Sequence, residues 1–277
     1  MDLHLQGVHV LVTGANGGIG LETTRLFLEQ GANVTAHYRS SGDALLPLLE
    51  RYGPTRLHRE HAELASEEEV INCFRQTEGS GFGFVEIAVI NHGRYESEDV
   101  SLKDMSLAQW ESTFSSNLTS TFLVARGYLG GLENGVRNAA GTEDRFGDRA
   151  AIILVGSTAG KYGEAGHADY AASKSAMMYG LTLTLKNEIV KIAPRARVNC
   201  VAPGWTRTPM AFAALQNPRT VDRVLATMAL RKVAEPEDVA SQIVLLASAR
   251  VSGHVSGQVL MVEGGMEGRL LNIPSDI

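Results

Sequence analysis

Short runs rich in apolar residues alternate with longer segments of helical periodicity along this chain. Apolar runs of strand length occupy 8–12, 34–38, 85–90, 150–155, 197–201 and 258–262, with a weaker one at 56–61. Helical periodicity covers 19–30, 44–51, 67–76, 107–128, 168–192 and 235–249. Buried strands that alternate with helices are typical of a parallel sheet covered on both faces. We therefore predict an α/β fold with a doubly wound parallel sheet.

One stretch interrupts this alternation. Residues 130–148 are polar and contain several glycines, which predicts a surface loop. Further along, the run 210–215 is apolar and predicts a short lid helix. The 277 residues show no composition break, so we expect a single domain over 1–277.

Composition narrows the classes of partner. The net charge is −6, so nothing favours a nucleic-acid or anionic membrane surface. No apolar run reaches transmembrane length, and the first strand begins too early to leave room for a signal peptide. We expect a cytoplasmic protein with no nucleic-acid or membrane partner.

Cysteine and histidine usage favours no metal site. Cys73 and Cys200 lie far apart and are expected to be buried thiols, with a structural disulfide as the alternative. His58 and His61 resemble a metal pair, but no third ligand accompanies them in this predicted strand.

Tyr170 and Lys174 carry the clearest chemical signal. Their i, i+4 spacing places both side chains on one face of a predicted helix. A phenol titrates near ~10, and a neighbouring ammonium is expected to lower that pKa toward the range of a general acid/base. Ser157 lies thirteen residues before Tyr170, directly after a predicted strand. Such a pair alone is weak evidence, because exposed helices carry it by chance.

A glycine-rich turn separates the first predicted strand from the first predicted helix. Gly14, Gly18 and Gly20 stand in the segment 13–20. A turn of this kind lets the backbone approach a pyrophosphate at the helix N-terminus. The alternative is a plain tight turn. The place of the glycine-rich segment directly after a strand favours the phosphate site.

Together these motifs resemble the short-chain dehydrogenase/reductase family from about Val8 to Gly265. The glycine-rich turn, Asn117, the Ser157–Tyr170–Lys174 set and Pro203-Gly204 before Thr208 follow the order and spacing of that family. The resemblance implies a Rossmann-type single domain and a nicotinamide cofactor. It also implies hydride transfer between a carbonyl and a secondary alcohol.

The resemblance implies a role for each residue of the catalytic set. Tyr170 would act as the general acid/base, and Ser157 would stabilise charge on the substrate oxygen. Lys174 would lower the Tyr170 pKa and hold the ribose, while Asn117 would bind a relay water and Thr208 the carboxamide. Taken singly, each has a structural alternative: Ser157 as a turn residue, Asn117 as a helix-packing residue, and Thr208 as a helix cap.

The cofactor is predicted to be NADP(H). NAD-binding relatives carry an acid where this chain has Tyr38, and Arg39 and Ser40 follow, so a guanidinium is available for a 2′-phosphate. Arg39 could instead be a solvated loop charge. The full set of expected cofactor residues is Gly14, Asn16, Gly17, Gly18, Ile19, Gly20, Arg39, Ser40, Glu63, Asn91, Gly93, Tyr170, Lys174, Pro203, Gly204, Thr206 and Thr208.

Two positions depart from the family pattern. His92 stands in Asn91-His92-Gly93, where the family has a small residue, and a packed or solvent-facing histidine is expected. Glu63 replaces an aspartate near the adenine, which weakens its assignment as a cofactor residue.

The resemblance places a substrate lobe at about 205–232. His167, Trp205 and Met210 are the expected substrate contacts, and Glu164 is a further candidate. Apolar positions on several faces of the helices at 107–128 and 168–192 agree with the family's habit of forming homodimers and homotetramers.

Three functions are considered for this sequence. The first is NADP(H)-dependent interconversion of a carbonyl compound and an alcohol, both small molecules. The second is a catalytically silent NADP(H)-binding sensor or partner subunit, which would be expected to have lost Tyr170 or Lys174. The third, a sugar-nucleotide epimerase or dehydratase, needs a larger C-terminal part than follows Gly204.

Overall fold

A computed structural model describes residues 2–96, 98–140 and 146–270. Within them one parallel sheet of seven strands has the order β3-β2-β1-β4-β5-β6-β7. The strands are β1 (His9–Val12), β2 (Asn33–Tyr38), β3 (Leu57–His61), β4 (Ile87–Ile90), β5 (Ala151–Val155), β6 (Arg197–Pro203) and β7 (Val259–Val262). This order and the all-parallel pairing confirm the predicted doubly wound Rossmann-type fold.

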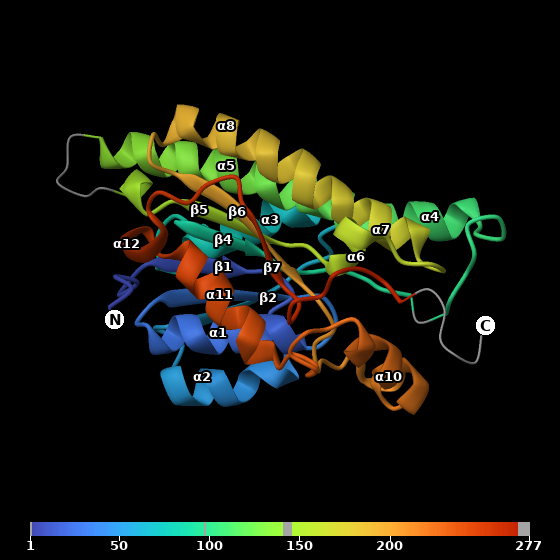
Figure 1. The fold of residues 1–277 in the computed structure, drawn as a ribbon. Helices are drawn as coiled ribbons and strands as arrows, with labels where there is room; N and C mark the ends of the chain where they lie inside the picture. Colours follow the sequence, from blue (N-terminus) through green and yellow to red (C-terminus); the bar gives the residue numbers. More distant parts are fainter. Residues whose placement is uncertain (1, 97, 141–145, 271–277) are drawn as a thin grey trace.

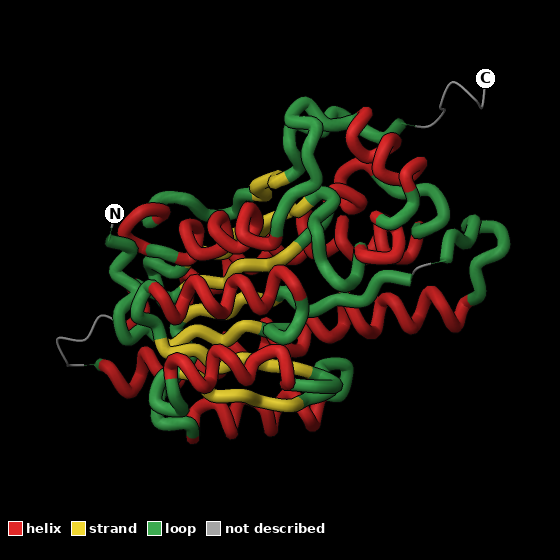
Figure 2. Tube along the Cα trace, turned by 90° about the horizontal axis from the view of Figure 1, so that it is seen from below, coloured by secondary structure: helices red, strands yellow, loops and turns green. Residues whose placement is uncertain are grey.

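Helices cover both faces of the sheet (Figure 1). One face carries α1 (Gly18–Glu29), α2 (Leu46–Tyr52) and α11 (Pro236–Ala247). The other face carries α3 (Glu67–Gly79), α4 (Leu107–Phe114), α5 (Ser120–Ala139), α7 (Ala168–Ser175) and α8 (Thr182–Ile192). The other helices are α6 (Thr158–Tyr162), α9 (Phe212–Leu215), α10 (Pro218–Ala226) and α12 (Ala249–Ser252). Viewed from below in Figure 2, helices cross in front of the strands.

Alternation along each strand builds the two cores. Successive side chains of a strand point to opposite faces. In β5, Ile152 and Leu154 therefore join the core beneath α5 and α8. Ala151 and Ile153 join the core beneath α1 and α11. The sheet is apolar on both sides because each face is covered, as predicted from the continuous apolar runs.

Local signals fix several helix ends. The Ser66 hydroxyl accepts a hydrogen bond from the Glu69 amide at 3.3 Å and caps α3. At α11 a capping box joins Glu235 and Asp238, with Pro236 in the first turn. Cys73 and Cys200 are buried free thiols, in agreement with the prediction.

The loop predicted over 130–148 is wrong for most of its described length. The helix α5 continues to Ala139, and a short 3₁₀ turn, η3, spans Phe146–Asp148. Phe146 is buried against Gly135, where a Cβ would come within 2.7 Å of the Phe146 ring. Helix packing thus overrides the weak local propensity of the glycines. Residues 141–145 of the predicted loop lie outside the described part.

The two long helices predicted at 107–128 and 168–192 each contain a π-helical segment. One, η2 (Ser115–Thr119), joins α4 to α5, and the other, η4 (Ala176–Leu181), joins α7 to α8. Such segments bulge a helix locally and are frequent at functional sites. Asn117 lies in the first of them.

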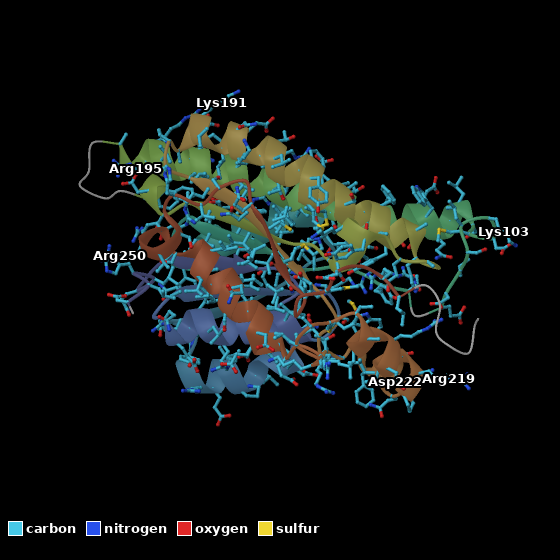
Figure 3. The ribbon with its side chains drawn as sticks, viewed as in Figure 1. Lys103, Lys191, Arg195, Arg219, Asp222 and Arg250 are labelled. Atoms are coloured by element: carbon cyan, nitrogen blue, oxygen red, sulfur yellow. The ribbon has the colours of Figure 1, made fainter. Side chains whose placement is uncertain are left out.

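Charged side chains are found at the outer surface. Lys103, Lys191 and Arg250 project away from the ribbon in Figure 3. In the described residues no helix combines the length and apolar character needed to cross a membrane.

The packing of Phe146 predicts a measurable loss of stability. Because the ring is 8% exposed in the core beneath α5, Phe146→Ala should lower the free energy of unfolding by about 3–5 kcal/mol. Leu102→Ala, at a 66% exposed side chain, is the control and should change it little. Urea denaturation followed by circular dichroism measures both, and equal midpoints would contradict the packing described here.

Candidate active site

A cavity of about 380 Å³ opens at the carboxyl ends of the strands. It is lined by segments that follow β1, β2, β4, β5 and β6, together with α7 and residues after β7. Crevices at this edge of open α/β sheets are the usual ligand sites. The predicted residues that line it are Gly14, Asn16, Gly17, Gly18, Ile19, Gly20, Arg39, Ser40, Glu63, Asn91, Gly93, Ser157, Tyr170, Lys174, Pro203, Gly204, Trp205, Thr206, Thr208 and Met210.

The glycine turn forms one end of the cavity. Gly14 has φ +63°, a conformation that favours glycine. A Cβ on Gly20 would collide with the Gly14 carbonyl oxygen, and one on Gly18 would lie 2.7 Å from the Thr208 methyl group. No side chain caps the N-terminus of α1. The backbone amides therefore face an open cradle, which fits the diphosphate of a dinucleotide.

His37 holds this turn in place, a role that sequence reasoning missed. Its Nδ1 accepts a hydrogen bond from the Gly14 amide at 3.1 Å, and its Nε2 lies 2.9 Å from the Ala62 carbonyl oxygen. Burial lowers the pKa of His37 to about 4, so the ring is neutral at pH 7. The strand position of His37 gave no local sign of this contact.

Beyond β2, the cavity rim carries a free guanidinium. Arg39 is exposed and makes no hydrogen bond or ion pair with any described residue. Glu63 also lines the rim, but its Oε1 accepts a hydrogen bond from the Ala65 amide at 3.1 Å. The Glu63 carboxylate is thus engaged with its own turn.

The segment after β4 is tied to the glycine turn. Asn91 Nδ2 donates to the carbonyl oxygens of Thr13 and Gly14 at 3.0 and 3.1 Å. His92 lines the cavity, and its Nδ1 and Nε2 each lie 2.8 Å from a hydroxyl, of Thr13 and Ser120 respectively. Burial holds the His92 pKa well below its ordinary value.

Ser157, Tyr170 and Lys174 meet in the cavity. Ser157 caps α6 by accepting a hydrogen bond from the Ala159 amide at 3.1 Å, and it also hydrogen-bonds Tyr170. Tyr170 and Lys174 lie one turn apart on α7, with the Lys174 Nζ 5.8 Å from the centroid of the Tyr170 ring. Lys174 Nζ donates to the Val155 carbonyl oxygen at 2.9 Å.

The pKa of Tyr170 is raised to about 12, whereas the sequence predicted that it would be lowered. Burial is the largest cause, and the hydrogen bond with Ser157 opposes it. Burial also lowers the pKa of Lys174 to about 8. Desolvation therefore dominates both groups, and the Lys174 ammonium is directed to the Val155 carbonyl oxygen.

Asn117 lies behind the cavity wall and does not line it. Its Oδ1 accepts from the Arg94 amide at 2.6 Å, and its Nδ2 donates to the Arg94 carbonyl oxygen at 3.0 Å. A Cβ added to Gly93 would lie 3.4 Å from Lys174 Nζ and 3.5 Å from Asn117 Oδ1. Asn117 thus holds the segment after β4 close to Lys174.

His167 does not reach the cavity either, in contrast to the expected substrate contact. It is 3% exposed, and its Nε2 lies 2.9 Å from Asp99 Oδ1. Its ring lies 4.4 Å from that of Tyr95, which meets the Tyr170 ring edge-on at 5.0 Å. Tyr95 lines the cavity, so His167 supports the wall from behind.

The segment after β6 closes the remaining side. Thr208 Oγ1 accepts a hydrogen bond from the Ala211 amide at 3.3 Å, and Thr206 Oγ1 donates to the Gly204 carbonyl oxygen at 3.1 Å. The expected lid helix is short, because α9 begins at Phe212, while Met210 is 57% exposed at the cavity edge.

Glu164, a candidate from the sequence, lines the cavity, and so do Tyr95 and Arg269, which sequence reasoning missed. Tyr95 lies two residues after Gly93, a position that the strand end could have indicated. Arg269 follows β7 and had no local signal. Among the described residues, no group of three possible ligands is placed to hold a metal ion.

Known proteins resemble this chain over almost its whole length. A family model described as enoyl-(acyl carrier protein) reductase matches residues 14–267. A 3-oxoacyl-[acyl-carrier-protein] reductase of Vibrio cholerae is 32% identical, with 95% of this chain and 99% of the relative covered. A human (3R)-3-hydroxyacyl-CoA dehydrogenase is 31% identical, with 95% and 96% covered.

Solved structures agree with these matches. A short-chain dehydrogenase/reductase from Brucella melitensis, titled glucose/ribitol dehydrogenase, superposes with a TM-score of 0.81 at 28% identity and covers 96% of this chain and 98% of its own. From the sequence matches, the shared fold and the glycine turn beside Ser157, Tyr170 and Lys174, we conclude that the chain belongs to the short-chain dehydrogenase/reductase family and is an oxidoreductase acting on CH–OH and C=O groups.

Proposed function

We propose that this protein reduces a carbonyl compound to a secondary alcohol with NADPH, and catalyses the reverse reaction with NADP⁺. The observation that carries the proposal is the meeting of Ser157, Tyr170 and Lys174 in one cavity whose other end is the glycine cradle. Gly14, Gly18 and Gly20 would hold the diphosphate of the cofactor. When bound, the nicotinamide supplies or accepts the hydride.

The side chains around Tyr170 supply the proton chemistry. With its pKa raised to about 12, Tyr170 carries its proton at pH 7 and is a donor for a carbonyl oxygen that gains negative charge. Ser157 shares a hydrogen bond with Tyr170 and would stabilise the same oxygen. The Lys174 ammonium, 5.8 Å from the centroid of the Tyr170 ring, would favour the phenolate left after proton transfer.

Two features favour NADP(H) over NAD(H). The guanidinium of Arg39 has no partner among the described residues and lies at the cavity rim, where it can grip a phosphate. The Glu63 carboxylate at the same rim accepts a hydrogen bond from the Ala65 amide, which makes it a poorer partner for ribose hydroxyls. The silent-binder alternative has no supporting observation, since Tyr170 and Lys174 are both present.

A homodimer or homotetramer is proposed from exposed apolar side chains on the outer helices. Phe122 of α5, Tyr179 of η4, and Leu183 and Val190 of α8 are 38–47% exposed. Covering such side chains on association would be favourable.

Removing the phenol hydroxyl tests the proton-transfer role. Tyr170→Phe should lower kcat for ketone reduction by roughly 10²–10⁴-fold, the usual contribution of general acid catalysis, while NADPH binding is retained. Tyr179→Phe, at a 43% exposed phenol in the following π-helical segment, is the matched control. Following NADPH absorbance measures both, and an unchanged kcat in Tyr170→Phe would refute the assignment.

The pKa of Lys174 predicts a pH dependence. Lys174 is protonated below about pH 8 and loses its charge above it. The kcat/KM for ketone reduction should therefore be level near neutral pH and fall as the pH rises through about 8. Initial rates between about pH 6 and pH 10 measure this profile. A profile that stays level to the alkaline end would show that the ammonium charge is not needed.

Truncation of Arg39 tests the cofactor preference. Arg39→Ala should weaken NADPH binding by roughly 10–100-fold, because a charge-assisted hydrogen bond is lost, and should leave NADH binding unchanged. Arg250→Ala, at an exposed arginine of α12, is the control. Fluorescence titration of each cofactor is the measurement. Equal affinities for NADPH before and after Arg39→Ala would rule out the phosphate contact.

A further inference from the structure

An ion pair lies in the wall of the cavity beside Tyr170. Arg269 Nη2 and Glu164 Oε2 are 3.4 Å apart, and the two side chains are 18% and 17% exposed. Both side chains line the same cavity as Tyr170, Tyr95 and Trp205. The pair is thus largely shielded from water but open to a bound molecule.

The segment after β7 is anchored so that Arg269 reaches this wall. Met266 is 4% exposed, and its carbonyl oxygen accepts a hydrogen bond from the Tyr162 hydroxyl at 2.8 Å. Three residues later, Arg269 Nε donates to the Gly163 carbonyl oxygen at 3.0 Å. The side chain is therefore fixed by the loop that also carries Glu164.

These contacts leave hydrogen-bonding capacity on both partners. Arg269 Nη1 and Glu164 Oε1 have no partner among the described residues. A guanidinium can only donate, and a carboxylate can only accept. A hydroxyl or an amide both donates and accepts, so it satisfies both atoms. A substrate carboxylate would be attracted by Arg269 but repelled by Glu164, and a substrate ammonium the reverse, so the pair favours neither charge.

Both charges also lie within electrostatic reach of the proposed acid. Glu164 raises the pKa of Tyr170, whereas Arg269 lowers it. Because the pair and Tyr170 line the same cavity, one molecule can place a polar group on the pair and its carbonyl at Tyr170.

We propose that Glu164 and Arg269 are specificity-determining residues that select carbonyl substrates bearing a neutral hydroxyl or amide group. This inference rests on the proposed carbonyl reduction and adds the substrate class to it. A purely aliphatic ketone would leave a desolvated charge pair without new hydrogen bonds, which is unfavourable.

Two matched pairs of ketones distinguish the two sources of the polar group. In the first, 4-hydroxy-2-butanone is compared with 2-pentanone, in which a methyl group replaces the hydroxyl. In the second, N-methylacetoacetamide is compared with methyl acetoacetate, which lacks the N–H. The wild-type kcat/KM should favour the polar member of at least one pair by about tenfold or more, as expected for a hydrogen bond to a charged group.

The variants Glu164→Leu and Arg269→Leu should bring that ratio close to one while 2-pentanone is still reduced, which also shows that they fold. Glu164→Gln keeps an acceptor and should retain part of the preference. Glu267→Gln, at an exposed side chain of the same segment, is the control and should retain all of it.

The experiment distinguishes failure of this inference from failure of the proposed carbonyl reduction. Reduction of all four ketones with ratios near one in the wild type, or with ratios unchanged in both leucine variants, would overturn this inference alone. Binding of NADPH without reduction of any ketone would contradict the proposed function and this inference with it.

Discussion

Parallel strand pairing is the constraint on which the rest of the site depends. It brings the carboxyl ends of β1, β4, β5 and β6 to the same edge of the sheet, and the segments that follow each strand meet there. Asn91 then ties the turn after β1 to the segment after β4. Lys174 reaches back from α7 to the last carbonyl of β5 at Val155. Residues distant in sequence thus share one cavity without any cross-link between them.

Desolvation sets the electrostatics of that cavity. Relative to their ordinary values in water, burial raises the pKa of Tyr170 and lowers the pKa of Lys174. A protonated phenol beside an ammonium suits proton donation to a carbonyl oxygen. The neutral ring of His37 holds the backbone at Gly14, the neutral ring of His92 contacts the Thr13 and Ser120 hydroxyls, and neither ring adds charge.

Much of the fold could be predicted from the sequence because its signals are local. The apolar runs, the glycine turn and the helical spacing of Tyr170 and Lys174 each depend on residues close in the chain. The end of α5 could not be predicted in this way. Its glycines predict a loop, but Phe146 packs onto Gly135 and stabilises the helix there. Local spacing also placed His167 near the pocket, whereas Tyr95 stands in front of it.

The least predictable part of the site comes from the far end of the chain. Arg269 reaches the cavity only because Tyr162 and Gly163 anchor its segment. No periodicity or motif indicates such a contact, since it depends on how the segment after β7 folds back. The cavity wall formed by Glu164 and Arg269 therefore depends on tertiary packing, whereas the glycine cradle depends on local sequence.

The most direct test of the central claim is whether purified wild-type protein oxidises NADPH when ketones are added. We expect ketone-dependent loss of NADPH absorbance with formation of the corresponding secondary alcohol. Tight NADPH binding with no turnover of any ketone or alcohol, in either direction, would contradict it and would favour a silent dinucleotide-binding role.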